Sequence, residues 1–327
     1  MRPVPDDPLP EWQPPTYTVD SNGKVRGAQP GSPHNWGRWG ELDQKGTANL
    51  LTAERIARAA GLARTGKRFS LALPVGRGQP NAGTRPDVLH LFSRTTADFL
   101  LGDAGVHGVQ TSDDIVVLPL QATTQLDGHG HFGYGDSLFN GFWAGLVTAG
   151  SGARRLGVHH QADGLVGRGV LLDVARAANI DPFESSISAG MLETTMAAQG
   201  IAVEAGDILL IRTGFLGTWL DHPDLRIRRR QSGLALDTIE WLADKDVAMV
   251  AADNRTVEAI PGPPGHPLLP WHRAALRDLG LLVGELFDLD YLAADCAGDG
   301  TYEFLFVASP LPIVNGVGSP LNPIAIK

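Results

Sequence analysis

The stretch Leu118-Pro-Leu-Gln-Ala-Thr-Thr-Gln-Leu-Asp-Gly-His-Gly-His131 alternates polar and apolar side chains and ends in two histidines. If it is extended, a period of two places the odd-numbered side chains on one face. That face then carries Gln121, Thr123, Gln125, Asp127, His129 and His131. Burying such a polar row is costly without partners, so it faces water or lines a site. Gly128 and Gly130 favour a site, because glycine lets the backbone approach a ligand closely.

Length and composition limit the kind of protein and its partners. The 327 residues suffice for one large domain or two small ones, and the net charge of −9 argues against nucleic acid and anionic membranes as partners. The basic run 226–230 is interpreted as a solvated surface. A single cysteine excludes an internal disulfide framework and a cysteine-rich zinc site. Without a run of about 20 apolar residues or an apolar leader, we expect a soluble, cytoplasmic protein.

The first residues differ from the rest of the chain. Residues 1–34 are rich in proline and lack a periodic apolar pattern, which predicts an N-terminal arm that stays loose or packs on another surface. Residues 35–327 are predicted to form a single α/β domain. Near its start, Trp36 and Trp39 lie among glycines and either line a pocket or fill the core. Thr52 is expected to cap a short amphipathic helix over 53–61.

Strands and helices alternate along this domain, which predicts a mixed β-sheet flanked by helices. Several strand candidates are apolar on both faces, as in a covered sheet. The predicted strands are 69–75, 114–120, 169–174, 207–212, 247–252, 281–287 and 302–307. The predicted helices are 189–198, 234–243 and 268–279.

A second polar pair lies near the C-terminus. Pro270 suits the first turn of a helix and Gly280 its end, so His272 falls early on that helix. Glu285 interrupts the apolar strand that follows, where a carboxylate needs a partner. A helix-turn-strand hairpin can bring His272 and Glu285 together, although a surface histidine and an ion-paired glutamate would give the same spacing.

The chain resembles the cyclase family of metal-dependent hydrolases, which includes bacterial kynurenine formamidases and isatin hydrolase. The family signature, His-x-Gly-Thr-His-x-Asp-x-Pro-x-His, aligns with residues 121–131, where Thr124, Asp127 and His131 match. Gln121 and Gln125 stand at the first two metal-binding histidines. Later family ligands, a His and a Glu about a dozen residues apart, resemble His272 and Glu285. Segments 39–52, 166–173, 205–214 and 318–320 are also similar to longer members.

This resemblance implies the swivelling β/β/α fold and hydrolysis of an amide, lactam, lactone or (thio)ester bond in a small, often cyclic molecule. In the family, one or two divalent ions activate the attacking water, and the histidine matching His131 is the acid/base. Asp127, His272 and Glu285 would be metal ligands. Phe132 and Phe139, which follow the motif, are candidate substrate-binding residues together with Trp36 and Trp39. The family forms homodimers or homotetramers, and no nucleotide cofactor is implied.

The two glutamines leave three interpretations open, because an amide oxygen is a weaker ligand than imidazole. In the first, one ion (Mn, Zn or Fe) is held by Asp127, His272 and Glu285, with Gln121 or Gln125 as a further oxygen ligand. In the second, His129 replaces a lost histidine. In the third, no metal binds. The protein is then either a non-hydrolytic cyclase or dehydratase that uses His131, or a small-molecule-binding pseudoenzyme.

Overall fold

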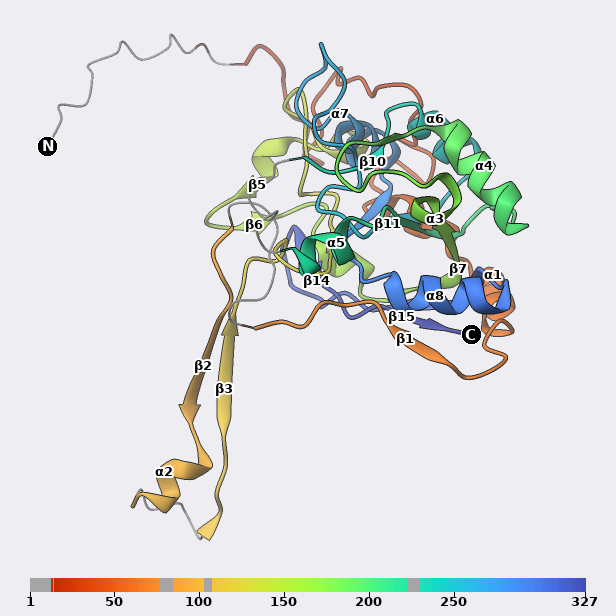
Figure 1. Ribbon diagram of the computed structural model, residues 1–327. Coiled ribbons are helices and arrows are strands. Elements are labelled where there is room, and N and C mark those ends of the chain that lie inside the picture. Colours follow the sequence, from red (N-terminus) through yellow and green to blue (C-terminus); the bar gives the residue numbers. More distant parts are fainter. Residues whose placement is uncertain (1–12, 14, 77–84, 103–107, 223–229) are drawn as a thin grey trace, which may run out of the picture.

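A mixed nine-stranded sheet forms the centre of the molecule (Figure 1). The computed structural model describes residues 13, 15–76, 85–102, 108–222 and 230–327. The strand order is β1-β15-β13-β7-β9-β11-β12-β4-β14. In that order the strands are Arg68–Ser70, Ile324–Ile326, Glu303–Ala308, Leu165–Asp173, Ile208–Arg212, Met249–Ala252, Leu282–Glu285, Gln125–Asp127 and Gly318–Pro320. The predicted α/β class with a mixed sheet flanked by helices is confirmed.

The middle of the sheet is parallel and its two sides are antiparallel. β7, β9, β11 and β12 run parallel, whereas β13 and β4 pair antiparallel with the outermost strands of this group. Parallel strands buried on both faces are rich in Val, Ile and Leu, as in the Ile-Leu-Leu-Ile sequence of β9. The change of direction between β12 and β4 places the carboxyl end of β12 beside β4.

Helices flank the sheet (Figure 1). They are α1 Ala53–Ala60, α3 Val174–Ala178, α4 Ala189–Gln199, α5 Phe215–Asp221, α6 Thr238–Asp244, α7 Pro270–His272 and α8 Asp290–Asp299. The Thr52 hydroxyl accepts from the backbone N–H of Arg55, which confirms the predicted cap of α1. The predicted helix over 268–279 is α7 followed by a π-helical segment, Arg273–Leu279, that ends at Gly280 with a φ of +59°. Leu234 belongs to a short strand, so α6 begins four residues later than expected.

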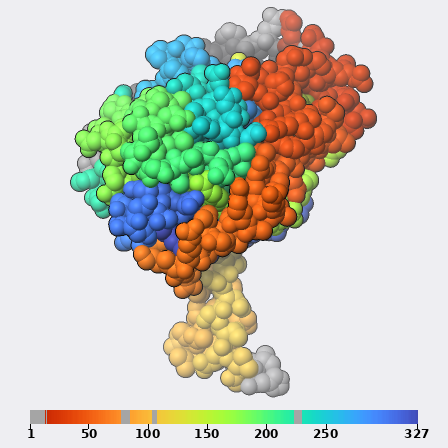
Figure 2. All heavy atoms as spheres, turned by 90° about the vertical axis from the view of Figure 1, so that its right-hand side faces the viewer, coloured from red at the N-terminus to blue at the C-terminus, as the bar shows by residue number. Residues whose placement is uncertain are grey.

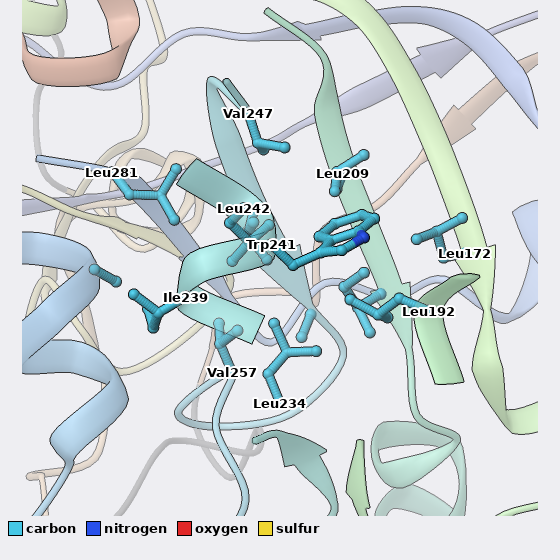
Figure 3. Packing of buried hydrophobic residues seen from close by; sticks show 14 of the residues in the cluster. Leu172, Leu192, Leu209, Leu234, Ile239, Trp241, Leu242, Val247, Val257 and Leu281 are labelled. Carbon is cyan, nitrogen blue, oxygen red and sulfur yellow. The ribbon is translucent and has the colours of Figure 1, made fainter. Parts of the chain in front are cut away.

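Alternating side chains of the central strands supply two cores. One packs Leu209, Val250 and Val283 against α4, α6 and the π-helical segment, as Figure 3 shows around Trp241 and Leu242. The other lies on the opposite face and packs Leu210, Met249 and Leu282 against α8. Burying such side chains contributes about 1.5–3 kcal/mol each. Leu126 of β4 belongs to the second core. The neighbouring side chains Gln125 and Asp127 therefore point to the first face.

A long hairpin stands away from this body. β2 (Leu89–Arg94) pairs antiparallel with β3 (Asp113–Val117), and α2 (Thr96–Leu100) lies between them. Both views show the hairpin projecting from the rest of the molecule (Figures 1 and 2). The strand predicted over 114–120 does not belong to the mixed sheet, contrary to what its place among the predicted strands implied. β3 ends at Val117 and all its residues are exposed, because its one partner strand belongs to the same hairpin.

The stretch 118–131 is less regular than a continuous strand. Residues 125–127 form β4, whereas 120–124 make turns and bends. The remaining short elements are 3-10 helices at Gly46–Leu50, Phe139–Gly141, Ala144–Leu146 and Val158–Gln161, and strands β5 Val147–Thr148, β6 Gly152–Ala153, β8 Ser186–Ile187 and β10 Gly233–Leu234. In the described residues, none of the helices combines the length and apolar character needed to span a bilayer.

The predicted N-terminal arm, residues 1–34, is described only in part, because residues 1–12 and 14 lie outside the described residues. The described part contacts the domain. Tyr17 accepts a hydrogen bond from the indole of Trp143 at 3.0 Å, and the Arg277 guanidinium donates to the Gln29 carbonyl at 3.0 Å. These contacts hold residues 17–29 against the 3-10 turns and the π-helical segment.

Candidate metal centre

Three buried side chains from separate parts of the chain meet beside the carboxyl end of β12. Asp127 comes from β4, Glu285 from the last position of β12 and His272 from the end of α7. Each offers a ligand atom within 4.8 Å of the other two. In the antiparallel pairing, Asp127 lies opposite Val283 and Gln125 opposite Glu285. Paired residues project to the same face, so the two carboxylates share it.

His272 is the centre of a hydrogen-bonded chain of carboxylates. Its Nε2 lies 3.2 Å from Glu285 Oε1 and 4.0 Å from Asp127 Oδ2. Its Nδ1 lies 2.6 Å from Oε1 of Glu258, which also accepts the backbone N–H of His272 at 3.0 Å. A carboxylate on the second ring nitrogen fixes the orientation and tautomer of a metal-binding histidine. Nε2 is thereby directed at Asp127 and Glu285.

Glu258 was not among the residues predicted from the sequence. Its side chain is buried, and it follows Val257, whose φ of +56° is unusual for a β-branched residue. Asn254 holds this turn, since its side chain accepts the Val257 N–H at 2.7 Å and its carbonyl accepts the Leu286 N–H at 2.9 Å. One asparagine thus supports the backbone beside Glu258 and beside Glu285. In the sequence, the one feature that could have indicated Glu258 as a site residue is its position as a lone glutamate within the apolar run 257–260.

His131 lies at the rim of the centre. Its Nε2 is 3.8 Å from Asp127 Oδ1, and 27% of its side chain is exposed, in contrast to the buried Asp127. An imidazole in this position can exchange protons with solvent and with a molecule bound at the centre. The structure therefore brings together four predicted site residues: Asp127, His131, His272 and Glu285.

The two glutamines lie in the same region, with unequal contacts. Gln125 Nε2 donates to Glu285 Oε2 at 2.6 Å and lies 3.5 Å from Asp127 Oδ1. Gln121 is buried beside Gly318 of β14, where a Cβ built on that glycine would come within 2.4 Å of its Nε2. Gln125 thus contacts two members of the centre directly.

His129 lies apart from this group. Its Nε2 is 2.9 Å from the Gly280 carbonyl and its Nδ1 is 3.3 Å from the Gln44 carbonyl. Burial lowers its pKa, which favours the neutral ring. Both nitrogens face backbone carbonyls, and the neutral ring donates to one of them. The interpretation in which His129 replaces a lost metal ligand therefore finds no support in this geometry.

The four candidate substrate-binding aromatics separate into two groups. Phe132 is half-buried and its ring centroid lies 6.0 Å from that of His272, so it borders the centre. Phe139 is fully buried in a small core with Trp36, whose indole donates to the Arg277 carbonyl at 2.7 Å. Trp39 packs beneath the Arg38 guanidinium. For Trp36 and Phe139, core packing is the role that these contacts support.

Electrostatics favour a cation at the centre. Burial and then the neighbouring Asp127 raise the pKa of Glu285 to about 7, although His272 opposes this. Burial lowers the pKa of His272, but hydrogen bonds to Glu258 and Glu285 outweigh it and raise the value to about 10. Carboxylates so close together disfavour joint ionisation unless a positive charge is present.

The donor set fits a divalent metal ion. Asp127 and Glu285 supply carboxylate oxygens, and His272 supplies an imidazole nitrogen. Two carboxylates and one imidazole suit manganese, iron(II) or zinc. Glu258, whose carboxylate contacts Nδ1 of His272, also fits such a site, because a metal-binding histidine commonly donates its other ring N–H to a carboxylate.

Comparisons with known proteins identify the family. A model of the Cyclase family matches residues 48–259, more than half of the chain. The chain belongs to the Cyclase family. A crystal structure of a novel cyclase is 40% identical to this Cyclase member, with a TM-score of 0.85, and the alignment covers 90% of this chain and 99% of that one. The resemblance stated from the sequence motifs is confirmed.

Two isatin hydrolase structures share the fold of this Cyclase member at lower identity. One, bound to the product analogue thioisatinate, is 18% identical with a TM-score of 0.58 and covers 84% of this chain and 99% of its own. Isatin hydrolase A from Labrenzia aggregata, bound to benzyl benzoate, is also 18% identical with a TM-score of 0.58, covering 83% and 97%. A search of curated proteins gives no match.

Proposed function

We propose that this Cyclase member is a metal-dependent hydrolase of an amide, lactam, lactone or (thio)ester bond in a small, often cyclic molecule. The observation that carries the proposal is the buried group of Asp127, His272 and Glu285, whose ligand atoms lie within 4.8 Å of one another. These residues would hold one divalent ion. When bound, such an ion lowers the pKa of water and polarises a carbonyl oxygen.

The chain's own residues would orient the reaction. Glu258 holds the His272 ring with Nε2 toward the two carboxylates, and Gln125 holds Glu285 through its Oε2. His131, partly exposed beside Asp127, takes a proton from the attacking water and returns it to the leaving group. Phe132 borders the site and would exclude water from one side of a bound ring.

Metal content and hydrolysis measured together test the proposal. The purified protein is expected to carry about one divalent ion per chain and to open members of a panel of lactams, lactones, amides and thioesters. Asp127→Ala and Glu285→Ala should lose both properties, whereas Asp163→Asn, an exposed carboxylate paired with Lys45, should keep both. If the first two variants retain full metal and activity, the proposal is wrong.

Two other outcomes would identify the alternatives. Activity that resists chelators and disappears in His131→Ala would indicate a metal-free enzyme for ring closure or dehydration. Binding of panel compounds without conversion, in a protein that takes up no metal, would indicate a pseudoenzyme. Either result contradicts the hydrolase proposal.

A further inference from the structure

Three buried polar atoms within residues 121–125 lack a hydrogen-bond partner among the described residues. They are Gln121 Nε2, Thr123 Oγ1 and Gln125 Oε1. Their residues are at least nine-tenths buried, with exposed fractions of 9%, 4% and 0%. Nearly all buried polar atoms in native proteins are paired, because leaving one unpaired costs free energy. Three unpaired atoms in one short stretch therefore call for a partner that the described residues do not supply, such as a bound molecule.

The glutamine amides lie on the same face of the sheet as the metal centre. Gln125 reaches Glu285 and Asp127 on that face. Gly318 of β14 is the register partner of Asp127, so a Cβ on Gly318 would project beside the Asp127 side chain. Such a Cβ would come within 2.4 Å of Gln121 Nε2. The Gln121 amide therefore occupies the space that the missing side chain leaves next to Asp127.

The orientation of the Gln125 amide follows from its partner. Its nitrogen faces a carboxylate oxygen of Glu285 at 2.6 Å, and the reverse orientation would place two oxygens in contact. Gln125 therefore presents its oxygen as a free acceptor. Gln121 presents a free donor, and the Thr123 hydroxyl can act as either.

We propose that Gln121 and Gln125 form a subsite for a neutral amide group of the substrate. The amide carbonyl accepts from Gln121 Nε2, and the amide N–H donates to Gln125 Oε1. An N–H donor at Gln121 disfavours a second cation, and neither glutamine carries charge to attract one. The subsite rests on the proposed function and narrows it, because a lactone or ester has no N–H for Gln125. It would favour lactams and amides that keep this hydrogen.

A pair of ring compounds tests the subsite by binding alone. Calorimetry on the protein as purified compares 2-pyrrolidinone, which offers a carbonyl and an N–H, with N-methyl-2-pyrrolidinone, which lacks the N–H. We expect the first to bind roughly tenfold more tightly, which corresponds to about 1.4 kcal/mol. Gln121→Met should weaken its binding by a similar factor. Gln161→Met, a buried glutamine bonded to the Lys45 carbonyl, should leave it unchanged.

Equal affinity for the two compounds, or unchanged affinity in Gln121→Met, would overturn the subsite. Metal content measured on the same samples separates this failure from failure of the proposed function. Protein that binds one ion but does not distinguish the compounds keeps the hydrolase proposal and loses the subsite. Protein that distinguishes the two compounds without binding any ion keeps the subsite and loses the hydrolase proposal.

Discussion

Replacing Glu258 with glutamine perturbs the metal centre without touching a metal ligand. The wild-type carboxylate contacts His272 Nδ1 at 2.6 Å and accepts the backbone N–H groups of His272 and Trp271 at 3.0 and 3.3 Å. Glutamine has the same shape, and its single oxygen can keep both contacts that Oε1 makes to His272, whereas the Trp271 N–H, which Oε2 accepts in the wild type, loses its acceptor. The negative charge behind the imidazole is lost.

The expected size of the effect follows from two opposing contributions. Replacing the carboxylate partner of a metal-bound histidine lowers metal affinity by about 10–100-fold. The Glu258 charge also helps to hold a proton on His272, whose pKa is about 10, and metal binding must displace that proton. Removing the charge eases this displacement, so we expect the lower end of the range at neutral pH, about tenfold or 1.4 kcal/mol.

Isothermal titration with Mn²⁺ and Zn²⁺ at pH 7 measures this change. Glu303→Gln is the matched control, because that glutamate pairs with Arg168 on β7, far from the centre in the strand order. The control should bind metal like the wild type. If Glu258→Gln binds both ions within twofold of the wild-type affinity while keeping its fold, Glu258 does not position His272 and the reasoning is refuted.

Three further predictions concern other parts of the chain. The double variant Gln121→His, Gln125→His supplies two imidazoles beside Asp127 and should raise metal content from one to two ions per chain, measured by elemental analysis; unchanged content would contradict the assigned positions. Burial raises the pKa of the Cys296 thiol to about 12, so iodoacetamide at pH 8 should label the protein in urea but leave the native state unlabelled. Leu171→Ala removes a fully buried side chain and should cost about 2–5 kcal/mol in urea unfolding, against less than about 0.5 kcal/mol for the exposed Leu268→Ala.

The sequence predicted the central strands well because they are buried on both faces. Continuous apolar runs such as the one in β9 leave little ambiguity about an internal strand. The apolar run in β3 was wrongly predicted to be a strand of the mixed sheet, because it shows the same continuous apolar pattern. Its residues are exposed on the hairpin, and a run of aliphatic residues does not reveal whether another chain or the same chain covers it.

The candidate site was predictable where the separation of two residues along the chain determined how close they lie in the fold. His272 and Glu285 lie on a helix and the next strand, and Gly280 ends that helix in the left-handed conformation that the turn requires. Glu258 was missed because it reaches His272 through a turn held by Asn254, and no local pattern encodes that contact. Phe139 packs into the core although it follows the motif, since aromatic composition alone does not distinguish a core from a pocket wall.

Anomalous scattering from a crystal of manganese-loaded protein shows directly whether Asp127, His272 and Glu285 hold a metal ion. We expect a single peak per chain, within coordination distance of these three residues, and its loss in Glu285→Ala. A peak bounded by other residues, a peak that persists in that variant, or no peak at saturating manganese would contradict this expectation.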